Sequence, residues 1–172
     1  MSSNLLMVGL RLIHIICGAF WVGGALSVAF FILPAQRAIG QPGMLFVRQL
    51  MMGQKFRSFM IGAAVLTILS GLMMYIRYAM AGGGWTQSNT GIILGVGAVA
   101  AIVAVGIGTG YTGKIGQKML ELGGAIQASG GPPTDAQKAE MEVLQGKMQS
   151  AFRIVASLLL IAVAAMASAR YL

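Results

Sequence analysis

The chain alternates long apolar stretches with shorter polar ones, and this pattern predicts four membrane-spanning helices. A bilayer core is about 30 Å thick, so a helix needs about 20 apolar residues to cross it. Pro34 follows the first stretch directly and is expected to end that helix, because proline lacks the backbone donor that a helix requires. The spans are predicted over about residues 5–33, 58–78, 90–113 and 151–169.

Two of the polar segments are also expected to be helical. Residues 43–56 mix apolar and basic positions, which predicts a short amphipathic helix at the membrane surface. In residues 114–150 the apolar positions recur every three or four residues on either side of the break SGGPPT. Thr134 and Gln137 match a capping box at the start of the second of these helices. We therefore expect helices three and four to continue beyond the membrane as an antiparallel hairpin.

Composition supports a membrane protein. Of the 172 residues, 57% are apolar and only 9% are charged, whereas soluble domains carry about 25% charged residues. We expect an all-α fold, an integral membrane four-helix bundle with an extended cytoplasmic helical hairpin between helices three and four. Residues 1–172 are expected to form a single membrane domain.

The net charge of +8 sets the expected orientation. Nine lysines and arginines lie in the two long polar segments and at their borders, against three near the other ends of the helices. Cytoplasmic loops carry such an excess, so both segments are expected in the cytoplasm and both termini outside, in the cytoplasmic (inner) membrane. No basic stretch is interleaved with exposed aromatic residues, so we expect no nucleic acid partner.

The first apolar stretch contains the only histidine of the chain, His14. An ionisable residue inside a bilayer is costly and is a functional-site hypothesis by default. Arg11, His14, Gly18 and Trp21 are spaced by three or four residues, so they share one face of a helix. Gly18 would leave room for a flat ring, Trp21 could stack on it, and Arg11 could reach the outer interface or pair with an anion such as a haem propionate.

Several roles for His14 remain open. It could ligate haem b, bind copper, relay protons, or form a hydrogen bond to a neighbouring helix. One histidine cannot form a bis-histidine haem site without a second chain, so the partner ligand would be methionine or another subunit. Antiparallel packing places a small set of residues near its depth, of which the methionines are candidate ligands: Ser70, Gly71, Met73 and Met74 of helix two and Met166 of helix four.

Other features carry weaker signals. The thirteen methionines suit either copper ligation or adaptable apolar packing. Helix three contains the GxxxG pairs Gly91–Gly95 and Gly106–Gly110, which favour close helix packing, within the bundle or between subunits, over a groove for a lipid, quinone or porphyrin. All four acidic residues lie in residues 114–150, so no span contains a carboxylate and we do not expect an enzyme.

The run LRLIHIICGAFWVGGALSVAFFILPA, with His14, Trp21 and the Gly23–Gly24 pair, resembles the first helix of copper-resistance D-type (CopD-like) and related uncharacterised four-helix integral membrane proteins. The second helix, with Arg57 at its start, is similar to theirs. A more distant likeness is to the haem-containing protoporphyrinogen oxidase of the HemJ type, although its intramembrane lysine has no counterpart here. The resemblance implies a four-helix bundle in which His14 is a haem or metal ligand.

These observations predict a small membrane protein that binds haem b or a metal through His14, with a redox or transport role. The first alternative is a structural or accessory subunit of a larger membrane complex, with no cofactor. The second is copper uptake across the membrane. The expected partners are the lipid bilayer and either further copies of the chain or a larger membrane complex.

Overall fold

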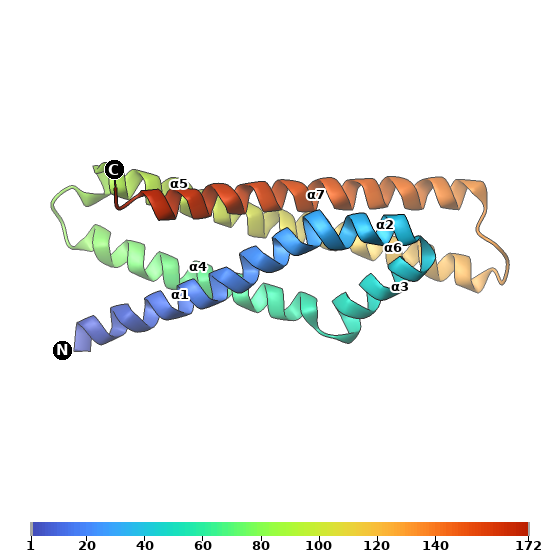
Figure 1. Ribbon diagram of the computed structural model, residues 1–172, viewed down its shortest axis with the longest axis horizontal. Helices are drawn as coiled ribbons and strands as arrows, with labels where there is room; N and C mark the ends of the chain where they lie inside the picture. Colours follow the sequence, from blue (N-terminus) through green and yellow to red (C-terminus); the bar gives the residue numbers. More distant parts are fainter. Residues whose placement is uncertain (1, 172) are drawn as a thin grey trace.

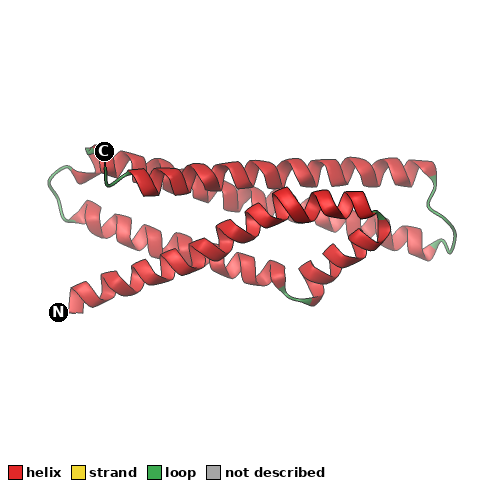
Figure 2. Cartoon of the chain, viewed as in Figure 1, coloured by secondary structure: helices red, strands yellow, loops and turns green. Residues whose placement is uncertain are grey.

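The computed structural model describes residues 2–171, and the described chain is helical throughout, with turns and without a strand (Figure 2). Four long helical rods run back and forth, and the two termini lie at the same end of the bundle (Figure 1). Each rod is long and apolar enough to cross a membrane, which is the architecture of a multi-pass membrane protein. The helices are α1 (Ser2–Ser27), α2 (Leu33–Ile39), α3 (Gln41–Arg48), α4 (Phe56–Met80), α5 (Asn89–Val105), α6 (Thr112–Ala128) and α7 (Asp135–Ser168).

The first rod does not end at Pro34, contrary to the sequence-based expectation. A π-helical turn, Val28–Ile32, joins α1 to α2, and the rod continues to Ile39. In this wider turn the Leu33 N–H donates to the carbonyl oxygen of Val28, five residues back. Pro34 follows this turn directly, where the regular hydrogen bonds between residues four apart are already interrupted, so its missing amide donor is tolerated.

A sharp corner reverses the chain after α2. Gly40 has a φ of 75°, which favours glycine, and α3 then folds back against α2. A Cβ on Gly43 would lie 2.6 Å from the carbonyl oxygen of Gln36, so the two helices need glycine at their closest approach. The predicted amphipathic segment 43–56 therefore corresponds to α3 and a π-helical turn, Gln49–Gly53, which end just before α4.

The third rod is longer than the predicted span 90–113. A π-helical turn, Gly106–Tyr111, connects α5 to α6, and together they form one helix of 40 residues, Asn89–Ala128. The fourth rod begins at the predicted capping box, in which Thr134 and Gln137 exchange side chain-to-backbone hydrogen bonds of 2.9 and 3.3 Å. The α6 and α7 helices, which a loop joins, contact each other.

Small residues form the centre of the bundle. The main helix pairs are α1 with α4 and α5 with α7. Between α5 and α7, a Cβ on Gly97 would lie 3.3 Å from the carbonyl oxygen of Ala162, an approach that small residues permit in lipid. The buried core combines Trp21 with alanines from α4, α5 and α7, whereas many large apolar side chains, such as Phe31 and Val99, face outward.

The rods differ in length, and the excess lies at one end. The α4 helix has 25 residues, about 37 Å at 1.5 Å per residue, which suffices for a bilayer. The rod containing α5 and α6 has 40 residues, about 60 Å. Figure 1 shows that α2, α3, α6 and the first half of α7 project together at the end opposite to the chain termini.

Candidate functional site

His14 lies on the face of α1 that contacts α4, and its ring is half-buried there. The Nδ1 atom is 2.8 Å from the backbone carbonyl oxygen of Thr67. The Ser70 hydroxyl lies 3.5 Å from the same nitrogen and donates to the carbonyl oxygen of Leu66 at 2.6 Å. The histidine thus joins the first two rods through a backbone acceptor that no side-chain pattern reveals.

This contact fixes the proton position on the ring. A carbonyl oxygen only accepts, so Nδ1–H donates to Thr67, and in the neutral imidazole the lone pair is on Nε2. Nε2 forms no hydrogen bond with the described residues, and it is not fully buried. Its lone pair is therefore not used within the described part of the chain. A histidine that donates Nδ1–H to a carbonyl has the arrangement common in metal-ligating histidines.

The ring occupies space that glycine leaves on α4. A Cβ on Gly71 would lie 2.7 Å from His14 Cε1 and 3.0 Å from Nδ1. One turn further along α1, a Cβ on Gly18 would lie 3.5 Å from the methyl group of Thr67. Gly18 thus brings α1 close to α4, and no flat ligand can enter between the helices at that point.

The other predicted site residues do not gather around the His14 ring. Arg11 donates to the Tyr78 hydroxyl at 3.0 Å, toward the end of the bundle that holds the termini. Trp21 is only 6% exposed and packs in the core cluster instead of forming a wall beside the imidazole. Met73 is 52% exposed, Met74 is half-buried, and neither is a hydrogen-bond partner of the ring.

Met166 packs elsewhere as well. Its Cγ lies 3.6 Å from the position that a Cβ on Gly97 would take, so it contacts α5. Within residues 2–171, no three histidine, cysteine, aspartate or glutamate residues come together in a group that could hold a metal ion. Any metal at His14 would need further ligands from methionine or from outside this chain.

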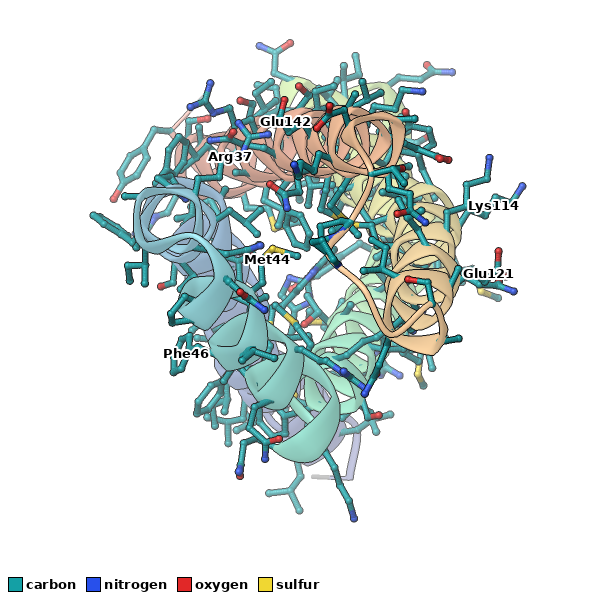
Figure 3. The ribbon with its side chains drawn as sticks, turned by 90° about the vertical axis from the view of Figure 1, so that its right-hand side faces the viewer. Arg37, Met44, Phe46, Lys114, Glu121 and Glu142 are labelled. Atoms are coloured by element: carbon teal, nitrogen blue, oxygen red, sulfur yellow. The ribbon has the colours of Figure 1, made fainter. Side chains whose placement is uncertain are left out.

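A feature that the sequence did not predict lies at the other end of the bundle. An open cavity of about 880 Å³ is lined mainly by α2, α3, the start of α4, α6 and α7. Figure 3 views the molecule from this end and shows Met44 of α3 pointing into the opening between the helices. Trp21 lines the deep end of the cavity, but His14 is not part of its wall. The two sites are separate.

Comparisons with models of protein families, with curated proteins and with solved structures found no match to this chain.

Proposed function

We propose that this chain is a multi-pass protein of the cytoplasmic membrane in which His14 ligates a haem b or a metal through Nε2. The observation that carries the proposal is the hydrogen bond from Nδ1–H to the Thr67 carbonyl oxygen, which orients the ring and leaves the lone pair on Nε2. Arg11, one turn away on the same face, keeps further guanidinium donors besides the one that binds Tyr78. These donors could pair with a haem propionate.

The residues fit a single axial ligand and no more. This chain offers one histidine, and the close α1–α4 contact at Gly18 and Gly71 leaves no space for a porphyrin between these helices. The group would lie on the outside of the bundle, with its second ligand from another copy of the chain, from another subunit, or from Met74. Bound haem would supply one-electron redox chemistry, while His14 and Arg11 would hold and orient it.

The test is the absorption spectrum and metal content of the protein purified from haem-replete membranes. We expect a Soret band or one bound metal, lost in both His14→Ala and His14→Asn. Asparagine is the sharper variant, because its amide nitrogen can replace Nδ1 as the donor to Thr67 while the Nε2 ligand disappears. A colourless, metal-free protein would overturn the proposal.

A second candidate is a structural role in an accessory subunit, favoured by the fit of the imidazole against Gly71. In that case His14→Asn would preserve assembly and stability, His14→Ala would weaken both, and no chromophore would be found. Copper uptake is less well supported. Among the described residues, six methionines line the separate cavity, which also carries arginines that repel a copper ion.

A further inference from the structure

The cavity between α2, α3, α6 and α7 is positively charged. Arg37, Arg48 and Arg57 line it, and no acidic residue is among the described residues of its wall. Lys114 also borders it, but its side chain extends away from the opening, as do Glu121 and Glu142 (Figure 3).

The arginines of the cavity have no carboxylate partner. The one ion pair found within residues 2–171 joins Lys138 to Asp135 at the start of α7. Arg57 reaches from α4 to α6, where its Nη2 lies 3.2 Å from the position that a Cβ on Gly113 would take. Arg37 donates to the Gln149 side-chain oxygen, a neutral acceptor. Arg37, Arg48 and Arg57 are exposed where they line the cavity, and guanidinium groups without carboxylate partners there favour an anionic occupant.

The deeper wall is apolar and adaptable. Methionine side chains from four helices and the π-helical turn before α4 face the cavity, and thioethers adjust to irregular apolar shapes. Trp21, Ala25, Ala64 and Val155 close the end that reaches into the bundle core. The volume of about 880 Å³ falls within the range of about 300–1,000 Å³ typical of small-molecule sites.

We propose that this cavity binds an anionic lipid. The phosphate headgroup is held by Arg57 and Arg37, and an acyl chain lies along the methionines toward Trp21. The positions of these residues agree with such a ligand. The shortest rod, α4, begins at Phe56, so Arg57 lies at one end of this rod. Trp21 lies deeper, among the core alanines. A polar head at the rod end and an apolar wall below it match an amphipathic ligand that enters from the bilayer.

The two tryptophans of the chain make the proposal testable. In a Trp85→Phe background, Trp21 is the sole tryptophan and reports on the cavity. The protein is reconstituted in phosphatidylcholine vesicles in two series. One series contains increasing fractions of brominated phosphatidylglycerol, and the other contains increasing fractions of brominated phosphatidylcholine. Brominated acyl chains quench tryptophan fluorescence on contact. We expect brominated phosphatidylglycerol to quench Trp21 at a much lower fraction than brominated phosphatidylcholine.

Charge variants then locate the headgroup. Arg57→Gln should lower the apparent affinity for phosphatidylglycerol about fivefold, the effect expected for one cation near an anionic lipid, and Arg57→Lys should restore most of it. Arg153→Gln is the matched control, because Arg153 is exposed on α7 and does not line the cavity. Equal quenching by both lipids, or equal losses in Arg57→Gln and Arg153→Gln, would overturn the proposal.

Discussion

At the scale of single residues, His14 fits closely against Gly71 in the membrane part of the molecule. The imidazole stands where a side chain at position 71 would be, with Cε1 only 2.7 Å from the place of a Cβ. The same ring donates to the Thr67 carbonyl oxygen. Interhelical hydrogen bonds of this kind contribute about 1 kcal/mol in membrane proteins. Shape and hydrogen bonding therefore hold α1 and α4 in one register.

Gly71→Ala should destabilise the bundle. The added methyl group cannot coexist with the present ring position, and overpacking of this kind costs about 1–3 kcal/mol. Thermal unfolding in detergent should show a lower Tm for Gly71→Ala than for Gly62→Ala, a control on the same helix where a Cβ meets nothing within 4 Å. The double variant Gly71→Ala/His14→Ala should lose less than the sum of the two single changes. Equal Tm values for Gly71→Ala and Gly62→Ala would contradict this fit.

The sequence predicted part of this site. Helical spacing placed His14 and Gly18 on one face, and antiparallel packing brought Ser70 and Gly71 to the depth of the histidine, where the structure has them. The Thr67 acceptor was missed because it is a backbone carbonyl, which every residue carries. Trp21 shares the helical face, but two turns further along it meets the core of α4, α5 and α7 and not the imidazole.

At the scale of elements, local backbone geometry changed one of the expected boundaries. A proline normally ends a helix, yet Pro34 is accommodated because the π-helical turn before it absorbs one extra residue. The third rod was expected to continue beyond residue 113, and it does so through a second π-helical turn, Gly106–Tyr111, into α6. Apolar periodicity does not reveal such turns, since they depend on how the chain packs. The start of α7 was predictable because its capping signal is local, between Thr134 and Gln137.

Thr134→Ala should loosen the first turn of α7. The hydroxyl accepts from the Gln137 amide at 3.3 Å, and replacing such a cap by alanine costs about 1 kcal/mol. Because this end of the helix is exposed, we expect faster hydrogen exchange at the amides of the first turn and little change in global Tm. Ser150→Ala, on an exposed position in the middle of the same helix, is the control and should leave those amides unchanged. Unaltered exchange in Thr134→Ala would show that the cap does not stabilise this turn.

At the scale of the whole molecule, the two ends of the bundle differ in chemistry. The end with the termini carries Arg11, Tyr78 and Trp85, with the Tyr78 and Trp85 rings stacked at 5.3 Å between centroids. The other end carries the projecting helices and the cavity with its arginines. The cavity could not be predicted, because its walls come from segments far apart in the chain. The only sequence signal was an excess of arginine without acidic residues in the segment before α4.

This asymmetry predicts the orientation in the membrane, which thiol labelling can test. In a Cys17→Ser background the chain has no cysteine, so one can be introduced by Ser129→Cys at the α6–α7 turn or by Thr86→Cys at the opposite end, both exposed positions. The excess of lysine and arginine at the α6–α7 end predicts that this end lies in the cytoplasm. An impermeant maleimide should then label Ser129→Cys in inverted vesicles only and Thr86→Cys in intact cells only. The reverse pattern would place the cavity and its arginines outside, and the proposed lipid would then come from the outer leaflet.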